Sequence, residues 1–525
     1  MSDARDITQI VVFGDSLSDT GNSFALTFGA IPPDPPYSLG RFSNGSVAVE
    51  YLADDLGLDL DPYYDDGNGN NFAVGGARTG ADNSNNDDIA AFLPGVTLPG
   101  LAEQIDTFES SLNSGNADAD ALYLVWAGPN DFLDYLGGGI PADPALLIEQ
   151  GIDNIVDGVT RLAELGAENL VVPNMSSLGR LPFSAEFRDE ATAITIAFNG
   201  GVSLALDNLD LPSEPVEAQI IPVDVFTATE TIATDPEQFG LNNVSDSLLL
   251  SGLEPTTTGF FFWDIFHPTT EAHALLADTL GKTISGDIPQ PTFNEIVGTT
   301  ERDFLFGTQN PDNVDGLDGN DLIFGGGGGD RLEGWGGDDW IFGERDNDII
   351  NGGDDDDYLW GERGDDLLFG GNGADKLLGS QGKDILIGGG DRDYLWGGSE
   401  QDYLLGGDGN DYLWGDGGND ILNGGGADDS IQGNHGDDLI DGSAGNDTLF
   451  GGAGADIFKL TVNFGTDRIV DFVAGSDRIM LSAGLTFADL SLNDNQISVT
   501  ATNETLATLT GFDTTTLTES DFIFV

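Results

Sequence analysis

The sequence predicts an α/β domain, in which helices flank a parallel sheet, followed by an all-β parallel β-roll and a small β cap. Short apolar runs alternate with amphipathic helical patterns in the first half of the chain. A nine-residue period then takes over, and strand-like patterns continue after that period ends. We therefore expect the α/β domain over residues 1–286, a linker over 287–297, the roll over 298–459 and the cap over 460–525.

Five apolar runs in the first domain predict strands, and the stretches between them predict helices because their apolar residues recur three and four apart. The predicted strands are Ile10–Phe13, Phe72–Val74, Leu122–Trp126, Leu170–Val172 and Ile220–Val225. The predicted helices include Val47–Leu58, Leu101–Leu112 and Ala145–Leu165. Strands that alternate with helices imply a mostly parallel sheet covered on both faces. The chemistry of such a sheet lies at the carboxyl ends of its strands.

The composition restricts the partners of the chain. Its 525 residues carry a formal charge of −75, from 92 acidic against 17 basic residues, and include no cysteine. This charge excludes nucleic acid as a partner and favours divalent cations. Without cysteine, the chain can form neither a disulfide nor a thiolate nucleophile. We expect no transmembrane segment, and the opening Met-Ser-Asp-Ala-Arg-Asp does not have the pattern of a signal peptide.

The nine-residue period runs from Gly298 to Lys459 as eighteen repeats without a slip in register. Position one is always Gly, position six is always Asp and position eight is always a large apolar residue. We expect each repeat to form a six-residue turn and a three-residue strand whose middle side chain faces inward. Glycine suits the turns because it accepts positive φ and lets neighbouring turns approach closely. Two repeats make one coil of the roll, so about nine coils stack.

Stacked turns bring rows of Asp carboxylates within a few ångström of one another, where they repel. Calcium binds carboxylate and carbonyl oxygens, so we expect it to hold the turns together and to make folding calcium-dependent. The repeats resemble the glycine-rich nonapeptides of the RTX (repeats-in-toxin) family. We predict several structural calcium ions and no organic cofactor. The predicted ligands are Asp321, Asp330, Asp339, Asp366, Asp375, Asp384, Asp411, Asp420, Asp438, Asp447 and Asp456.

The residue at position four of the repeat is expected to decide how strongly each turn binds calcium. Gly is the commonest residue at this position. Glu301, Glu400 and Ala427 occupy this position in three repeats, and such side chains tolerate a left-handed backbone poorly. We expect weak or absent calcium near them. The best sites are expected where regular repeats share an edge, as for Asp321 with Asp339, Asp366 with Asp384, and Asp420 with Asp438 and then Asp456.

Positions seven and nine of the odd-numbered repeats face outward on one sheet and are mostly aromatic. They are Phe304/Phe306, Leu322/Phe324, Trp340/Phe342, Tyr358/Trp360, Tyr394/Trp396 and Tyr412/Trp414, interrupted by Lys376/Leu378. An exposed aromatic face of this length is typical of a contact surface. We favour a ladder that stabilises the roll, or a seam against the first domain, over a platform for lipid or polysaccharide.

The last segment breaks the period but keeps the strand-like runs Arg468–Phe472 and Arg478–Leu481, which predict a cap on the open end of the roll. The chain ends with Asp521-Phe522-Ile523-Phe524-Val525. This ending resembles the uncleaved C-terminal signal of type I secretion substrates. The resemblance implies export by an ABC transporter and a secreted, extracellular or cell-surface location. The roll is expected to stay unfolded at the low calcium of the cytoplasm and to fold outside.

The chain has three histidines, and one of them is a candidate catalytic base. His435 lies at a variable repeat position and is expected at the surface. His273 lies on a predicted helix and is expected to be structural. His267 follows Asp264 by three residues, so that on one turn the carboxylate can meet the imidazole and fix its tautomer. A serine nucleophile needs such a base.

Four sequence blocks, in order, place a serine and its partners at strand ends and helix starts. They are Phe13-Gly14-Asp15-Ser16, Asn71-Phe72-Ala73-Val74-Gly75-Gly76-Ala77, Gly128-Pro129-Asn130-Asp131 and Asp264-Ile265-Phe266-His267. Together they resemble the GDSL, or SGNH, hydrolase family over most of the first domain. The resemblance implies a flavodoxin-like fold, with Ser16 as nucleophile and Asp264 and His267 as its partners. It also implies an oxyanion hole from the backbone amides of Ser16 and Gly76, with Gly75 as an alternative, and the Asn130 side chain.

The resemblance implies a secreted, calcium-dependent serine ester hydrolase that acts through an acyl-enzyme. The runs Gly21-Asn22 and Gly40–Gly45 are most similar to the lipase, phospholipase and haemolysin-like branch of the family. A simple acyl ester, a phospholipid and an acylated polysaccharide all remain open as substrates. The zinc-protease motif His-Glu-x-x-His is absent, as is a Gly-x-Ser-x-Gly elbow at Ser16. The alternative class is a calcium-dependent cell-surface or adhesion protein with a relic esterase domain.

Overall fold

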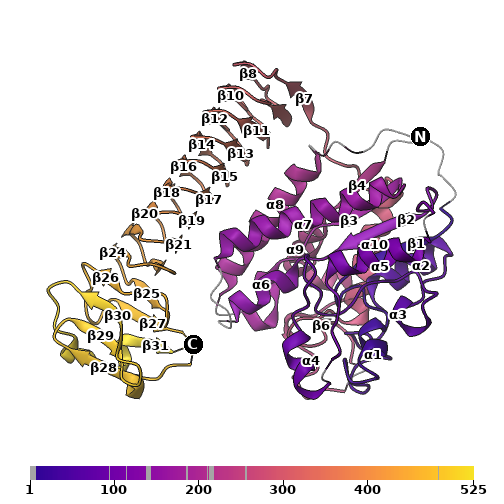
Figure 1. Ribbon diagram of the computed structural model, residues 1–525, viewed down its shortest axis with the longest axis horizontal. Coiled ribbons are helices and arrows are strands. Elements are labelled where there is room, and N and C mark those ends of the chain that lie inside the picture. Colours follow the sequence, from indigo (N-terminus) through magenta and orange to yellow (C-terminus); the bar gives the residue numbers. More distant parts are fainter. Residues whose placement is uncertain are drawn as a thin grey trace. The chain divides into compact units, whose positions relative to one another are not determined.

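A computed structural model describes residues 7–93, 95–113, 115–137, 143–184, 187–207, 209, 211, 218–254, 257–482 and 484–524. The first six residues, on which the signal-peptide prediction depends, lie outside this part, as does Val525. The chain divides into two compact units, Met1–Leu136 with Glu149–Pro291 and Gly137–Ile148 with Thr292–Val525 (Figure 1). Among the described residues, no helix is long and apolar enough to cross a membrane.

The first unit is built on a four-stranded parallel sheet. Its strands are β1 (Ile10–Gly14), β2 (Leu122–Trp126), β3 (Asn169–Pro173) and β4 (Gln219–Val223), hydrogen-bonded in this order. The predicted strand Phe72–Val74 lies on the free side of β1, where Phe72 N–H donates to Val12 O (2.7 Å) and Val74 N–H donates to Gly14 O (3.0 Å). It forms too few ladder pairs to extend into a strand. Counting this segment as second in the chain gives the order 2-1-3-4-5 of a flavodoxin-like sheet, which confirms the predicted fold class.

Helices cover both faces of this sheet. Val49 and Leu52 of α2 (Ala48–Leu56) and Leu276 and Leu280 of α10 (Thr270–Ile284) pack on one face. On the other face, Phe108 of α5 (Leu101–Ser111) meets Phe13 at a ring distance of 5.5 Å. The remaining helices are α1 (Asn22–Leu26), α3 (Tyr63–Asp66), α4 (Asn86–Phe92), α6 (Pro129–Leu136), α7 (Pro144–Glu164), α8 (Arg188–Asp207) and α9 (Val225–Thr234). A short pair of strands, β5 (Asn243–Ser247) and β6 (Phe260–Phe262), precedes α10.

Two predicted strand ends are wrong. In the run Arg468–Phe472 of the last segment, the strand ends at Ile469. The run Ile220–Val225 was expected to be entirely strand, but β4 ends at Val223 and Val225 opens α9. The reason is Asp224, whose Oδ1 accepts the N–H of Thr227 (2.9 Å) and caps the helix. The three predicted helices agree with α2, α5 and α7 to within two residues.

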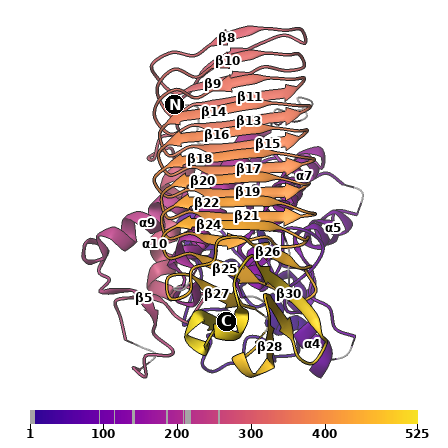
Figure 2. The same cartoon turned by 90° about the vertical axis from the view of Figure 1, so that its left-hand side faces the viewer.

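The second unit contains two parallel sheets that run the length of the roll (Figure 2). One sheet carries β8 (Phe304–Phe306), β10 (Leu322–Phe324), β12 (Trp340–Phe342), β14 (Tyr358–Arg363), β16 (Lys376–Gln381), β18 (Tyr394–Ser399), β20 (Tyr412–Gly417), β22 (Ser430–His435) and β24 (Thr448–Ala453). The other carries β7 (Asn294–Val297), β9 (Asp312–Asp315), β11 (Arg331–Gly336), β13 (Ile349–Asp354), β15 (Leu367–Asn372), β17 (Ile385–Gly390), β19 (Tyr403–Asp408), β21 (Ile421–Gly426), β23 (Leu439–Asp441) and β25 (Ile457–Leu460). Odd and even repeats therefore alternate between sheets, as the period predicts.

The boundaries of the roll strands differ from the prediction in two ways. β7 lies inside the predicted linker and already pairs with β9, so the roll begins before Gly298. Many strands are also longer than three residues, because they continue into the next repeat. In β14, for example, Tyr358–Trp360 pair with Lys376–Leu378, and Glu362 and Arg363 pair with the next coil as well.

Glycine has two separate roles in the repeats. At positions two and four the backbone takes positive φ in most repeats, as at Gly371 (104°) and Gly373 (140°). Position-one glycines do not have positive φ, and they are required by close approach instead. A Cβ on Gly379 would lie 2.3 Å from Oδ2 of Asp384.

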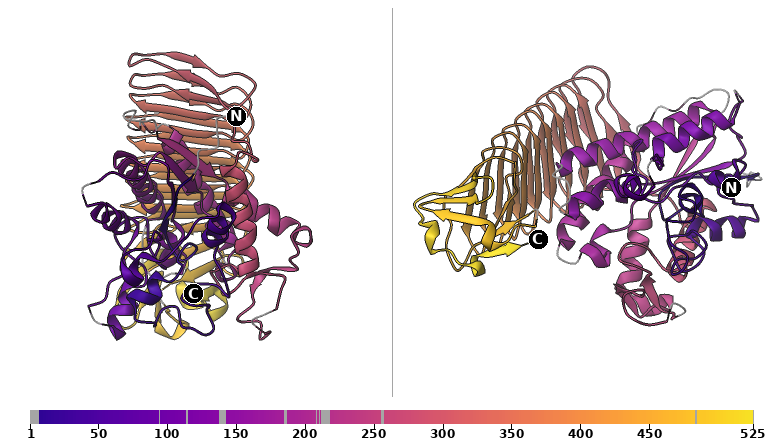
Figure 3. Two further views of the ribbon diagram at one scale, coloured as in Figure 1. Left: turned by 90° about the vertical axis from the view of Figure 1, so that its right-hand side faces the viewer. Right: turned by 60° about the horizontal axis from the view of Figure 1, so that its bottom comes forward.

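The core of the roll is a single file of position-eight side chains between the two sheets. From Val314 to Phe458 each of these side chains is fully buried. The cap continues both sheets through β26 (Asp467–Ile469), β30 (Glu504–Leu509), β27 (Arg478–Leu481) and β31 (Phe522–Phe524), and the antiparallel strands β28 (Leu490–Asn493) and β29 (Gln496–Val499) complete one edge (Figure 3, right, yellow). The cap therefore extends the core of the roll.

The outward aromatic residues of the odd repeats stack as a ladder. Phe306, Phe324, Phe342 and Trp360 follow one another at ring distances of 5.2, 4.9 and 4.6 Å, with planes within 9° of parallel. At the interruption, the Lys376 ammonium lies 3.9 Å from the centre of the Tyr358 ring. The stacking is the arrangement that the ladder interpretation expects.

Candidate active site

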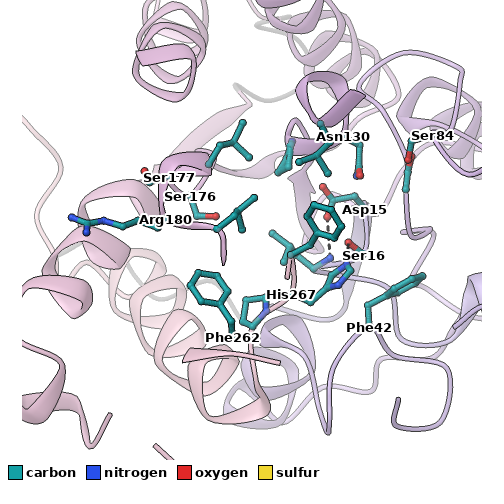
Figure 4. Close-up of a pocket in the computed structure, with 18 of the residues that line it drawn as sticks. Asp15, Ser16, Phe42, Ser84, Asn130, Ser176, Ser177, Arg180, Phe262 and His267 are labelled. Atoms are coloured by element: carbon teal, nitrogen blue, oxygen red, sulfur yellow. Dashed lines mark hydrogen bonds between the residues drawn. The ribbon is translucent and has the colours of Figure 1, made fainter. Parts of the chain in front are cut away.

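The carboxyl ends of β1 and β2, together with the turn before α10, bring Ser16, Asn130 and His267 together (Figure 4). Ser16 follows β1, Asn130 lies in the first turn of α6 after β2, and Asp264 and His267 lie between β6 and α10. The hydroxyl Oγ of Ser16 lies 2.9 Å from Nε2 of His267, although 251 residues separate the two. Nδ1 of His267 lies 2.7 Å from Oδ2 of Asp264.

The Asp264 carboxylate is held by four donors. Its Oδ1 accepts the backbone N–H groups of Phe266 and His267, each at 2.7 Å. Its Oδ2 faces the His267 ring and also accepts the Tyr37 hydroxyl at 2.7 Å. Burial would raise the pKa of Asp264, but the facing His267 and these hydrogen bonds outweigh it and lower the pKa to about 2. Asp264 is therefore ionised at any pH near neutral.

The two alternatives for a backbone oxyanion donor differ in how their N–H groups are used. Gly75 N–H donates to Asp19 Oδ2 (2.9 Å) and to Ser23 Oγ (2.8 Å), so it is engaged away from Ser16. Gly76 lines the same cavity as Ser16, at φ +80°, and a Cβ there would meet Asn85 Nδ2 at 2.0 Å. The geometry therefore favours Gly76 over Gly75.

Asn130 is buried and faces the same cavity. One of its amide hydrogens is used by Ala77 O (3.1 Å), which fixes the orientation of the side chain. Pro129 opens α6, a position where the missing proline N–H costs no helical hydrogen bond. Asn130 therefore lies in the first turn of a helix that Pro129 opens.

A cavity of about 310 Å³ extends from Ser16 along the ends of the strands. Its apolar lining includes Leu133, Leu178, Leu181, Phe262 and Phe266. Ser176 and Ser177, which follow β3, and Arg180 line the part of the cavity away from His267 (Figure 4). The Arg180 guanidinium is paired with Glu230, to which its Nε donates at 2.9 Å. The cavity is therefore mainly apolar. Arg180 is the one lysine or arginine among its described lining residues, and Glu230 neutralises its charge.

Three buried acids in the catalytic loops were missed by sequence reasoning. Asp19 accepts the backbone N–H groups of Asn22 (2.6 Å) and Ser23 (3.0 Å), and so fixes the turn into α1. Asp131 accepts Thr79 Oγ1 (2.8 Å), and burial raises the pKa of Asp131 to about 6. Burial also raises the pKa of Asp15 to about 7. An Asp two residues before a Gly is typical of an Asx turn, and this signal points to Asp19, whose Oδ1 accepts the N–H of Gly21 (2.8 Å).

The other two histidines have the surroundings that the sequence predicts. His273 is fully buried in α10 and its Nδ1 accepts the N–H of Ala48 (3.2 Å). Burial lowers the pKa of His273 to about 3, which keeps the ring neutral. His435 is exposed in β22.

The position-six aspartates form a continuous row along each edge of the roll. The backbone N–H of one Asp donates to Oδ1 of the Asp in the next coil, as from Asp339 to Asp357 (2.8 Å) and from Asp366 to Asp384 (2.9 Å). The second oxygen of these carboxylates is buried and has no hydrogen-bond partner in the part of the chain that the structure describes. This holds for every predicted calcium ligand except Asp456, and also for Asp348, Asp357, Asp393, Asp402 and Asp429. Free carboxylate oxygens therefore occur also in repeats whose position four is not Gly. The rows of aspartates are more uniform than the substitutions at position four predict.

The surroundings of these free oxygens fit a bound cation. A Cβ on Gly352 would lie 2.3 Å from Asp357 Oδ2 and 2.7 Å from Gly370 O, so a carboxylate and a carbonyl of the next coil face the same small space. Burial, with the charges of Asp375 and Asp339, raises the pKa of Asp357 to about 9. An anion is therefore unfavourable there unless a cation accompanies it. No three acidic or histidine side chains converge among the described residues, so the donors would be single carboxylates with backbone carbonyls, a set that calcium accepts.

Two of the three turns with a substituted position four keep the regular backbone. Glu400 (φ 81°) and Ala427 (φ 73°) adopt the left-handed conformation, whereas Glu301 does not. The Glu400 and Ala427 side chains therefore add local strain without removing the turn. Weak calcium binding near them stays a prediction.

The site is that of a serine hydrolase, with a hydroxyl, an imidazole and a carboxylate in hydrogen-bonded sequence beside an apolar cavity. The pattern of the GDSL-like lipase/acylhydrolase family matches residues 10–280, and the chain belongs to this family of ester hydrolases. The RTX calcium-binding nonapeptide repeat matches residues 297–332, 333–368, 369–404, 396–431 and 423–458.

Three curated relatives each match about half of the chain. A GDSL esterase/lipase of Arabidopsis thaliana is 26% identical over 52% of this chain and 88% of its own length. The thermolabile hemolysin of Vibrio parahaemolyticus is 28% identical over 52% of this chain and 63% of its own. The phosphatidylcholine-sterol acyltransferase of Aeromonas hydrophila is 27% identical over 52% of this chain and 88% of its own.

Proposed function

We propose that the chain is a secreted, calcium-dependent serine ester hydrolase that cleaves acyl esters through an acyl-enzyme on Ser16. The observation that supports this most directly is the hydrogen-bonded sequence from Ser16 Oγ through the His267 ring to Asp264. The alternative, a surface protein with a relic esterase domain, gives no reason to keep this arrangement intact.

In the proposed mechanism, His267 Nε2 takes the hydroxyl proton as Ser16 Oγ attacks the ester carbonyl. Asp264 keeps the proton on Nδ1 and stabilises the imidazolium that forms. The negative oxygen of the tetrahedral intermediate is stabilised by the backbone N–H groups of Ser16 and Gly76 and by the Asn130 amide, at about 3 kcal/mol for each donor. His267 then protonates the leaving alcohol, and water, activated by the same ring, releases the acid.

The substrate class follows from the cavity. We place the acyl chain against Leu133, Leu178, Leu181, Phe262 and Phe266, where burial of each methylene contributes about 0.8 kcal/mol. The cavity holds the volume of roughly ten water molecules, which favours an acyl chain of medium length. Arg180 is paired with Glu230, so the cavity offers no free cation for a phosphate among its described lining residues. We therefore favour a neutral acyl ester over a phospholipid.

Calcium, when bound, supplies the positive charge that the Asp rows of the roll require, and we assign it a structural role. The Asp residues at position six would hold it, with carbonyls of adjacent coils. Coupling of calcium to folding supports export of an unfolded chain by a type I secretion system, with folding outside the cell.

Hydrolysis of chromogenic esters with acyl chains of increasing length tests the proposal. We expect a maximum at medium length, and Ser16→Ala should lower kcat/KM by roughly 10³-fold or more. Ser18→Ala is the matched control, because Ser18 is buried in the same motif but does not line the cavity. Equal rates for Ser16→Ala and the parent chain would contradict the proposed nucleophile, and a parent chain without any esterase activity would favour the relic domain.

A further inference from the structure

Tyr37 contacts the catalytic carboxylate from a part of the chain that none of the four sequence blocks includes. It lies in the loop between α1 and α2, and its hydroxyl donates to Asp264 Oδ2 at 2.7 Å. This is the same oxygen that faces Nδ1 of His267 at 2.7 Å. Two donors, a phenol and an imidazole, therefore share one carboxylate oxygen.

The Tyr37 ring is held in place independently of this hydrogen bond. It makes edge contacts with Trp263 and with Phe42, each at a ring distance of 6.3 Å. Phe42 in turn packs on the His267 ring at 5.2 Å. Removal of the hydroxyl alone should leave this packing intact, so the role of the hydrogen bond can be separated from that of the ring.

The other carboxylate oxygen needs no help from Tyr37. Two backbone N–H groups of its own turn hold Oδ1 of Asp264, and they fix the rotamer of Asp264 without Tyr37. The hydroxyl instead draws charge from Oδ2, on the side that faces the imidazole. A carboxylate with an added donor has less negative charge to stabilise the imidazolium.

We propose that Tyr37 is a positioning residue that divides the charge of Asp264 Oδ2 between its own hydroxyl and the Nδ1–H of His267, and so sets the pH at which His267 becomes an active base. This inference rests on the proposed function. Tyr37 does not line the cavity, so it acts through Asp264 and not on the substrate. With Tyr37 included, four groups are hydrogen-bonded in sequence: Tyr37, Asp264, His267 and Ser16.

Other titratable groups act on His267 and must be distinguished from Tyr37. Asp15, at the end of β1, interacts with the His267 charge and itself has a pKa near neutral. His273, on α10, also interacts with His267 but is neutral because of its burial. A kinetic pH profile can therefore contain the titration of Asp15, and a direct spectroscopic reading of the histidine is needed beside it.

The test compares the full calcium-loaded chain with Tyr37→Phe. We expect the acid limb of kcat/KM to move to higher pH by about 0.5–1 unit, because the carboxylate then stabilises the imidazolium more strongly. We expect kcat on the plateau and KM each to stay within about twofold, because the ring packing and the rotamer of Asp264 do not depend on the hydroxyl. In the proton NMR spectrum, the low-field Nδ1–H signal of His267 should titrate with the same upward shift.

Two further variants make the test specific. Incorporation of 3-fluorotyrosine at position 37 strengthens the phenol as a donor, so the acid limb should move to lower pH. Tyr123→Phe is the matched control, because Tyr123 is a buried tyrosine that donates to Asp118 O (3.0 Å) at the other end of β2, and its pH profile should equal that of the parent. Profiles and NMR titrations of both Tyr37 variants that superimpose on the parent would overturn the inference. A parent chain without esterase activity would overturn the proposed function, while the NMR titration would still test Tyr37.

Discussion

The hydrolase unit and the roll bury carboxylates in different ways. In the hydrolase unit, Asp264 is buried with four donors, one of which is the facing imidazole, so it stays ionised. In the roll, each buried position-six carboxylate has one oxygen in the ladder and, in most coils, a second oxygen without a partner. The first unit therefore satisfies its catalytic acid with protein groups, whereas the roll leaves carboxylate oxygens that a bound cation would satisfy. The comparison is the basis of our proposal that one chain carries both a self-contained site and a fold that responds to calcium.

Removal of calcium should have the largest effect and should separate the two regions. We expect a chelator to unfold the roll, because its carboxylates lose their counter-ions, while the strands and helices of residues 7–284 stay protected. Hydrogen exchange on the full chain, read peptide by peptide, measures both regions at once. Equal protection of the roll with and without chelator would contradict the claim that the roll, unlike the hydrolase unit, needs calcium to stay folded.

Substitution of a position-one glycine should be the next largest effect. In Gly379→Ala the new methyl would lie 2.3 Å from Asp384 Oδ2, so we expect a loss of about 2–4 kcal/mol in the unfolding free energy of the calcium-loaded roll. Gly390→Ala is the control, because its nearest neighbour would lie at 3.6 Å and its φ is not positive. Denaturant titration followed by the signal of the roll measures both variants. Equal stability of the two would contradict the close-approach role of position one.

Acid should destabilise the hydrolase unit through His273. Because burial lowers the pKa of His273 to about 3, its neutral form contributes stability above the ordinary histidine pKa of about 6.5, and this is lost as pH falls toward 3. Between pH 6.5 and 4.5 we expect the parent to lose about 2 kcal/mol more than His273→Gln. His435→Gln, at an exposed position, should follow the parent. Parallel pH curves for His273→Gln and the parent would contradict the burial argument.

The smallest effect is expected at a strained turn of the roll. Ala427 has φ 73°, so Ala427→Gly should raise the unfolding free energy by about 0.5–1 kcal/mol through relief of the left-handed strain. Ala374→Gly is the control, because Ala374 does not have positive φ and the change should lower stability by a similar amount. A loss of stability in both variants would show that strain at position four is unimportant.

The two regions also differ in how well the sequence predicts them. The period of nine predicts the alternating sheets and the buried file of position-eight side chains from Val314 to Phe458, because every repeat packs its position-eight side chain in the same way. It does not predict that position-one glycines serve close approach and not positive φ, since that depends on contacts between coils.

In the hydrolase unit, the motifs predict which residues meet, including Ser16 and His267, which are 251 positions apart. They do not predict Tyr37, because its contact with Asp264 spans 227 positions and no local spacing signals it. The end of β4 was missed for the opposite reason, a local cap at Asp224 that overrides an apolar run.

Covalent labelling tests the central claim most directly. The calcium-loaded chain is treated with a fluorophosphonate ester, and the modified residue is located by peptide mass spectrometry. We predict a single adduct on Ser16, absent in Ser16→Ala and formed roughly 10³-fold more slowly or worse in His267→Ala. An adduct that persists in Ser16→Ala, or an unlabelled Ser16 in a chain that hydrolyses esters, would contradict the assignment of Ser16 as nucleophile.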